Sequence, residues 1–427
     1  MQFRRRDIPG LFLGAALGGL GLATGRRARA EVPADSRRFL FLFADGGWDP
    51  TWVFAPAFDN PRVDMPTDGS FLAEEGGLRW VSHSSRPSVD RFFRSWGPQT
   101  CILNGMEVRS IAHERCIRLL LTGSATPGVA DIPTRIAAGV GTPPALGHMV
   151  FSGPAFQAAD SRGTVRAGGR GQLGALLDGS CAEGANPALG LPPAGVQSLE
   201  DAYVQARVAS RAGAAGRGAE QRVQEAYLQA LQDILEAEAQ LPHLSSSSSD
   251  SLSQLLTAVE LLGSGASRCA MVHDLGYYSA RWDHHSELNR QSPSYEALFS
   301  NLQQVMEQLS RSPGLYSPSL LDEITVVVFS EMGRFPALNS SMGKDHWMTT
   351  SLMLLGGGIR GGQVLGGYSD AFTGVPMVMD SGELDPSGKK GVLLTPAHVG
   401  ATLLQLAGMD PAQAFGAEIE PLLAALS

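Results

Sequence analysis

Continuous apolar runs alternate with amphipathic segments along the chain, and this alternation predicts an α/β fold. The apolar runs have the composition of buried strands, and they cover residues 38–44, 100–104, 148–152, 269–275, 325–329 and 351–355. Helical spacing predicts helices at 112–122, 131–138, 294–309 and 396–409. The order strand, helix, strand from residue 269 to residue 329 predicts a right-handed parallel crossover.

Three other regions have different patterns. Residues 56–100 and 160–200 show little periodicity, and we expect loops there, with short helices in the first region. Residues 198–240 are rich in Ala, Gln, Glu and Arg and predict two amphipathic helices that break near residues 213–218, before a serine-rich linker at 245–249. We therefore expect a helical insertion or cap over about 198–263.

Composition narrows the class of protein. The chain has 427 residues, of which 43% are hydrophobic and 18% charged, as in a soluble globular protein with a sizeable core. The net charge of −9 argues against a nucleic-acid partner. The cysteines Cys101, Cys116, Cys181 and Cys269 form no CxxC pair, and we expect most to be buried. If a disulfide forms, Cys101 with Cys116 is the favoured pair.

The first 30 residues resemble an export signal. Arg4, Arg5 and Arg6 precede a weakly apolar, Gly-rich stretch at 8–24, and residues 28–30 (ARA) fit a small-x-small cleavage site. The alternative is an uncleaved anchor, but about 17 Gly-broken residues are short for a bilayer span. We expect the twin-arginine export machinery as a partner, cleavage after Ala30, and a periplasmic or extracellular protein with no stable membrane span. Residues 31–427 are then expected to form a single domain.

Candidate chemistry lies directly after the strand at 325–329. Polar residues gather in and before a Gly- and Ser-rich loop, namely Glu331, Arg334, Asn339, Asp345 and His346. Ligands bind beyond the carboxyl ends of strands in open α/β sheets. This mixture suits a metal-assisted reaction on an anion. A strand-end salt bridge with a capping Asp explains the same residues equally well.

Two further groups could supply metal ligands. Asp45 and Asp49 follow the first strand, although an ordinary Asp-Gly turn is the commoner explanation for such residues. Asp283, His284 and His285 form the densest group of ligand types in the chain. In an extended segment Asp283 and His285 point to the same side and could share one metal, which we favour over an exposed polar loop.

Ser110 and His113 lie near the start of the helix expected at 112–122. The amides at a helix N-terminus favour an anion, so both residues are candidates for catalysis. A simple N-cap role explains Ser110 equally well.

Taken together, the motifs FLFADGGWD, RSIAHERCIRLLLTG, WDHH, SEMGRFPALN, GKDHW and LLGGGIRGG resemble the "domain of unknown function 1501" family of the alkaline phosphatase and sulfatase superfamily. The resemblance implies a three-layer sandwich, with a mostly parallel sheet between helices and metal ligands on strand-end loops. It implies metal ligation by Asp45 or Asp49 and by Asp283, His285, Glu331, Asp345 and His346. It also implies that Arg334 and Asn339 hold an anionic group.

The same resemblance marks departures from the superfamily pattern. His113 stands where a nucleophilic Ser or Cys is expected, and Met332 replaces a histidine. The export signal, the ligand types and the resemblance together predict an exported hydrolase of a phosphate or sulfate ester that uses zinc, manganese or calcium. Because no nucleophilic Ser or Cys stands at the expected position, attack by metal-bound water is the simpler mechanism. The alternative is an exported binding or assembly protein that keeps the fold without catalysis.

Overall fold

A computed structural model of the chain describes residues 32–139, 144–158, 163–168, 172–177, 194–214, 218–244, 250–277 and 281–427. The expected export signal, the serine-rich linker and Cys181 lie outside these ranges. Within them, no helix is both long and apolar enough to cross a membrane.

The described residues form an eight-stranded sheet with the strand order β12-β4-β11-β8-β1-β7-β5-β6. Its central strand β1 (Arg38–Ala44) pairs in parallel with β7 (Cys269–Asp274) and with β8 (Ile324–Phe329). The strand β11 (Thr349–Gly356) runs antiparallel to both of its neighbours, β8 and β4 (Thr100–Glu107). The remaining strands are β5 (His148–Val150), β6 (Thr164–Arg166) and β12 (Gln363–Gly366), and their pairings are parallel.

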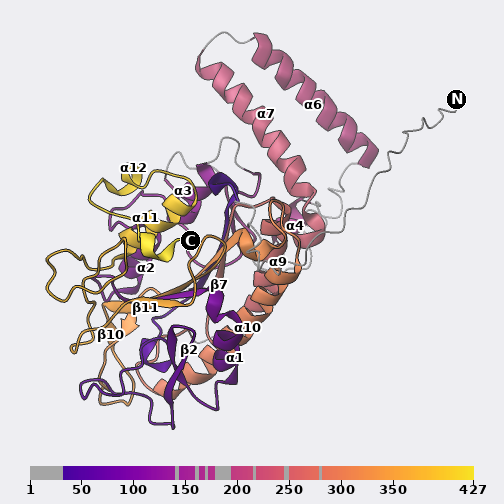
Figure 1. Ribbon diagram of the computed structural model, residues 1–427. Helices are drawn as coiled ribbons and strands as arrows, with labels where there is room; N and C mark the ends of the chain where they lie inside the picture. The colour runs from indigo at the N-terminus through magenta and orange to yellow at the C-terminus, as the bar shows by residue number, and fades with distance from the viewer. Residues whose placement is uncertain are drawn as a thin grey trace, which may run out of the picture. The chain divides into compact units, whose positions relative to one another are not determined.

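Strand β1 is apolar from Phe39 to Ala44 because both of its faces are covered. Leu40 and Leu42 belong to one hydrophobic core, with the helices α1 (Pro87–Trp96), α9 (Ser251–Ser264) and α10 (Gln291–Arg311). Phe39, Phe41 and Phe43 belong to a second core, with α2 (His113–Thr122), α3 (Ile132–Ala138) and α11 (Pro396–Leu406). Figure 1 shows these two sets of helices on opposite faces of the sheet. The predicted three-layer α/β sandwich with a mostly parallel sheet is confirmed.

Residues 56–100 contain more regular structure than their sequence indicates. A hairpin of β2 (Phe71–Glu75) and β3 (Leu78–Ser82) precedes α1. The residues of β2 are largely exposed, so the strand lacks an apolar signature. The available signal is the turn, where Gly76 and Gly77 have φ values of 58° and 88° that favour glycine.

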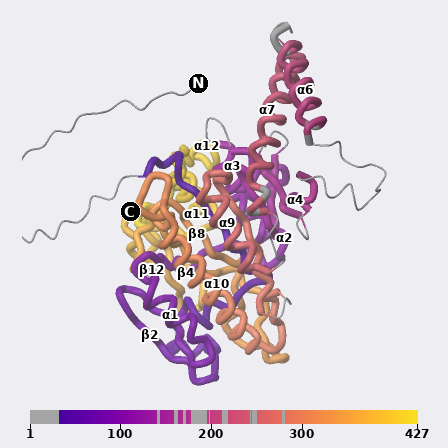
Figure 2. The backbone as a smooth tube through the Cα atoms, turned by 90° about the vertical axis from the view of Figure 1, so that its right-hand side faces the viewer, coloured from indigo at the N-terminus to yellow at the C-terminus, as the bar shows by residue number. Residues whose placement is uncertain are grey.

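The two helices expected after residue 198 are α6 (Ala194–Ala214) and α7 (Ala219–Glu238), which pack against each other and lie side by side in Figure 2. The last part of the range expected as an insertion behaves differently. Helix α9 buries Leu255, Val259 and Leu262 in the first core and packs against β7 and β1. The range proposed as an insertion therefore has to end before α9.

The smaller elements are α4 (Gln172–Leu177), α8 (Leu241–Leu244), α12 (Ala412–Phe415) and a two-stranded ladder of β9 (Gly333–Arg334) and β10 (His346–Trp347). Among the described cysteines, Cys101, Cys116 and Cys269 are free and buried. Their expected burial is confirmed, and Cys101 and Cys116 form no disulfide in this structure.

Candidate metal centre

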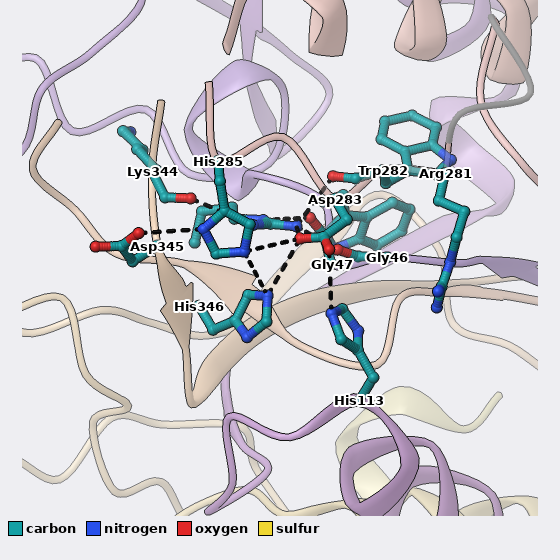
Figure 3. A network of polar contacts seen from close by, with 12 residues as sticks. Gly46, Gly47, His113, Arg281, Trp282, Asp283, His285, Lys344, Asp345 and His346 are labelled. Atoms are coloured by element: carbon teal, nitrogen blue, oxygen red, sulfur yellow. Dashed lines mark hydrogen bonds and ion pairs between the residues drawn. The ribbon is translucent and has the colours of Figure 1, made fainter. Parts of the chain in front are cut away.

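The candidate site lies at the carboxyl ends of β1, β7 and β8. The loop after β1 supplies Gly46 and Gly47, the segment after β7 supplies Asp283 and His285, and the loop after β8 supplies Glu331. Because β11 is antiparallel, its amino end is at the same edge, and the segment just before it adds His346. His113 enters from the N-terminus of α2. Figure 3 shows His113, His285 and His346 converging on Asp283.

Asp283 is at the centre of the cluster. Its Oδ1 lies 3.1 Å from His285 Nε2 and 3.1 Å from His346 Nε2, and these two nitrogens are 2.9 Å apart. Its Oδ2 lies 3.4 Å from His113 Nε2. The ligand atoms of His113, Asp283 and His346 all lie within 4.8 Å of one another. We call His113, Asp283, His285 and His346 the metal cluster.

Each ring of the cluster has its other nitrogen against an acceptor. Nδ1 of His113 lies 2.7 Å from Glu331 Oε1, Nδ1 of His285 lies 3.1 Å from Asp345 Oδ1, and Nδ1 of His346 lies 2.8 Å from the carbonyl oxygen of Ile111. A neutral imidazole in such a position keeps its proton on Nδ1. The three Nε2 lone pairs then point inward at a carboxylate, and Nε2 of His113 is buried without a hydrogen-bond partner.

Without a metal, His113 favours its protonated form instead. The carboxylates of Asp283 and Glu331, one beside each ring nitrogen, raise the pKa of His113 to about 9. Burial alone would raise the pKa of Asp283, but contacts with His113, His346 and Arg334 hold it well below its usual range. A positive charge beside Asp283 therefore stabilises the cluster. Arg334 supplies one, and a proton on His113 or a bound cation can supply a second.

Glu331 is expected from the sequence as a ligand, but it lies behind His113 instead. The side chain is completely buried, and its two oxygens accept hydrogen bonds from the amides of Gly46 (3.0 and 3.1 Å) and Gly47 (3.2 Å). The Ser330 hydroxyl donates a further bond of 3.0 Å. With its oxygens used in this way, Glu331 orients His113.

Arg334 is also buried, so the expected contact with a bound anion is not available to it. Its guanidinium donates to the carbonyl oxygens of Gly46, Gly47 (2.7 Å), Trp282 (3.1 Å) and Lys344 (3.2 Å). It also donates to Asp283 Oδ1 over 2.8 Å. Arg334 thus ties three loops together and fixes the central carboxylate.

Neither aspartate after β1 joins the metal cluster. Asp49 is completely buried in an ion pair with Lys344 (2.9 Å) and accepts hydrogen bonds from the amide and hydroxyl of Thr51. Asp45 contacts Arg281 (2.6 Å) and His273 (3.0 Å). Burial would raise the pKa of Asp45, but these two partners lower it below its usual value. The expectation that Asp45 or Asp49 ligates the metal is thus replaced by two separate ion pairs.

The remaining candidates from the sequence, Asn339, His284 and Ser110, lie outside the set that we call the metal cluster. Asn339 donates to the carbonyl oxygen of His285 and to Asp345 Oδ1, both over 3.0 Å, and so positions the outer partner of His285. His284 is buried, and this burial lowers its pKa to about 4. Ser110 accepts from the Ala112 amide, and in the described part of the chain it has no hydrogen bond to the metal cluster.

Sequence reasoning missed Lys344, Arg281 and His273. Lys344 and Arg281 each neighbour a predicted ligand along the chain, but their partners after β1 are more than 230 residues away. A signal for Arg281 was available in principle, because a cation commonly accompanies carboxylates at an anion site.

Comparisons with known proteins give one family and several remote structures. Among solved structures, the chain is similar to Ps i-CgsB in complex with k-i-k-neocarrahexaose (8% identity, 90% of this chain and 77% of that chain, TM-score 0.38). It is also similar to a protein in the alkaline phosphatase superfamily from Vibrio parahaemolyticus (10% identity, 92% and 70%, TM-score 0.38). No curated protein matches. The model of the family described as "Protein of unknown function (DUF1501)" matches residues 94–380, and the chain belongs to this family.

Proposed function

We propose that the chain is an exported, metal-dependent hydrolase of a phosphate or sulfate ester. One observation carries this proposal: three imidazole Nε2 atoms and the Asp283 carboxylate face one another, while each ring's Nδ1 is held by an acceptor from outside. When the rings are neutral with their protons on Nδ1, these acceptors repel one another unless a cation lies among them. Histidines that ligate a metal usually donate their other N–H to a carboxylate or carbonyl.

The donor set fits a divalent ion. His113, Asp283, His285 and His346 would hold it, and three imidazoles with one carboxylate favour zinc over calcium, which prefers oxygen ligands. Manganese also accepts this mixture. When bound, the ion would polarise the ester and promote attack by water at neutral pH.

The chain's own residues keep the donors in position. Glu331, Asp345 and the Ile111 carbonyl set the tautomer and orientation of the three rings. Arg334 fixes Asp283 and the two glycines that bind Glu331. The His285 side chain is 47% exposed, so an ester can approach from its side.

A water nucleophile is favoured over a covalent mechanism. Ser110 has no hydrogen bond to the metal cluster within the described ranges, and His113 is held by Glu331 and Asp283. The thiol of Cys116 is buried, and burial raises its pKa to about 11. The lack of a placed hydroxyl or thiol also favours the second candidate, a metal-stabilised binding protein without turnover.

Elemental analysis combined with an activity screen separates the candidates. We expect close to one zinc per chain in the purified protein, with hydrolysis of aryl phosphates or sulfates. The Asp283→Ala/His285→Ala variant should lose both, whereas His83→Ala, which removes a histidine outside the cluster, should keep both. A folded parent without metal would contradict the hydrolase. Stoichiometric metal without turnover on either ester class would support the binding protein.

A separate experiment, independent of metal content and hydrolysis, tests export. If the first 30 residues act as a twin-arginine signal, replacement of Arg4, Arg5 and Arg6 by Lys should retain the protein in the cytoplasm in cell fractionation. Alanine replacements of Arg26 and Arg27, downstream of the apolar stretch, serve as the control and should leave export intact. Unchanged export after the first replacement would refute this part of the proposal.

A further inference from the structure

Arg281 occupies a strained position at the start of the segment that carries Asp283. Its backbone has φ of 62°, a left-handed conformation that is unfavourable for a residue with a long side chain. Its amide donates to the carbonyl oxygen of Leu275 over 2.9 Å. Such conformations persist where surrounding structure enforces them, and they cluster at functional sites.

The guanidinium of Arg281 is anchored on one side and open on the other. Nη2 donates to Asp45 Oδ1 over 2.6 Å, and the side chain is 44% exposed. Asp45 is itself fixed, because its amide donates to the carbonyl oxygen of Asp274 (3.0 Å) and its Oδ2 faces His273 Nε2 (3.0 Å). No second acceptor for this guanidinium occurs in the described ranges, so donors remain for a ligand.

Arg281 lies near the metal cluster. In Figure 3 its side chain and that of His285 flank Asp283 from opposite sides. Asp45, which accepts from the guanidinium, directly precedes Gly46, whose amide binds Glu331, the partner of His113. Arg281 is therefore connected to the metal cluster through the loop after β1 and through Asp283, two residues further along the chain.

An anionic ester at this site needs a cation besides the metal. The carboxylates Asp45, Glu331 and Asp345 surround the cluster and would repel it, whereas Arg334 is completely buried and donates to carbonyl oxygens and Asp283. The planar guanidinium fork matches two oxygens of a tetrahedral oxyanion.

We infer that Arg281 binds two non-bridging oxygens of the phosphate or sulfate group, and that Asp45 acts as its anchor. This inference rests on the proposed function. It gives Asp45 a positioning role through Arg281 and moves the anion contact from Arg334 to a residue two positions before Asp283.

The test measures affinity for inorganic phosphate and for sulfate by equilibrium dialysis, with zinc-loaded and with EDTA-treated protein. Zinc content is determined in parallel. Arg281→Asn removes the charge while tolerating the left-handed backbone. We expect its affinity for the preferred anion to fall about 10- to 100-fold, since a charge-assisted bidentate contact is lost. The anion affinity of Arg281→Lys should lie between those of the parent and Arg281→Asn. Arg311→Gln changes an exposed arginine at the end of α10, and its anion affinity should match that of the parent.

Asp45→Asn separates anchoring from direct contact. The change should weaken anion binding in the parent and add nothing in the Arg281→Asn background, because Asp45 acts through Arg281. An unchanged anion affinity in Arg281→Asn with full zinc content would overturn the inference, as would loss of zinc from that variant alone. Absence of anion binding by the parent in both arms would overturn it too. If the parent binds no zinc, the proposal of a metal-dependent hydrolase is contradicted. The anion affinities of the EDTA-treated parent and Arg281→Asn still test whether Arg281 binds the anion.

Discussion

Each histidine of the metal cluster is oriented by a different kind of acceptor. Glu331 is buried, Asp345 is exposed and Ile111 contributes a backbone carbonyl. His113 has the buried carboxylate as its partner, and its pKa is raised to about 9. A proton and a metal therefore compete for this ring.

Zinc binding should release a proton and strengthen as pH rises. In the metal-free protein His113 has a pKa of about 9, so it carries a proton at neutral pH that the metal must displace. Affinity should increase by up to about tenfold per pH unit below pH 9 for this proton and level off above it. Calorimetry in buffers of different ionisation enthalpy counts the protons. His113→Gln should release fewer, and equal release by parent and variant would contradict the assignment.

Breaking the ion pair between Asp49 and Lys344 should destabilise the fold. Both side chains are completely buried, and Lys344→Met leaves the Asp49 carboxylate without its cation. We expect a loss of about 3–5 kcal/mol in the free energy of unfolding, measured with urea. Adding Asp49→Asn should recover part of it, because no unpaired charge then remains. A single variant as stable as the parent would refute this prediction.

Some residues of the site could be predicted from local sequence, and others could not. Alternate residues of an extended segment share a side, and this spacing placed Asp283 and His285 together. The roles of Arg334 and Asp49 could not be read in this way. Whether a charged side chain is buried depends on partners from distant loops, here the Gly46 carbonyl for Arg334 and Lys344 for Asp49.

At the scale of elements, continuous apolar runs predicted the buried strands well, since both faces of the sheet are covered. The apolar runs did not indicate whether a strand runs parallel or antiparallel to its neighbours. The apolar run that became β11 has the same composition as the parallel strands. Its antiparallel course arises because residues 330–348, through the ladder of β9 and β10, return the chain to the edge where β8 ends. That course brings the segment before β11 back to the edge where the other ligands lie.

Gly343→Ala should weaken metal binding through this returning segment. A Cβ at Gly343 would lie 2.2 Å from the carbonyl carbon and oxygen of His285, so the two loops must separate. We expect at least about a tenfold loss of zinc affinity, as is typical when support of a metal ligand is disturbed. Gly195→Ala in α6, where a Cβ meets no atom within 4 Å, is the matched control and should not change zinc affinity. Equal affinities for both variants would argue against a close fit of the loops.

At the scale of the whole molecule, the two cores on either side of the sheet hold the strands in one arrangement. Composition and pattern predicted the fold class. The extent of the helical insertion was harder to predict, because α9 has the helical pattern of its neighbours but packs on β7 and β1. Only the packing separates a core helix from an inserted one.

The buried thiols of these cores should report unfolding. Cys101 and Cys269 are completely buried, and burial raises the pKa of Cys101 to about 12. We expect alkylating reagents to modify Cys101, Cys116 and Cys269 only as the protein unfolds in urea. Mass spectrometry of the separate peptides follows each cysteine. Modification of Cys101 or Cys269 without denaturant, at a rate independent of stability, would contradict the packing described for these strands.

The wide spacing of the ligands along the chain has a consequence for biosynthesis. The metal cluster draws on residues from His113 to His346, so it cannot assemble until most of the polypeptide has left the ribosome and folded. If the first 30 residues direct export of the folded protein, a metal that binds as the cluster assembles is acquired before transit. The cytoplasmic metal pool, rather than the supply outside, would then decide which ion the mature protein carries.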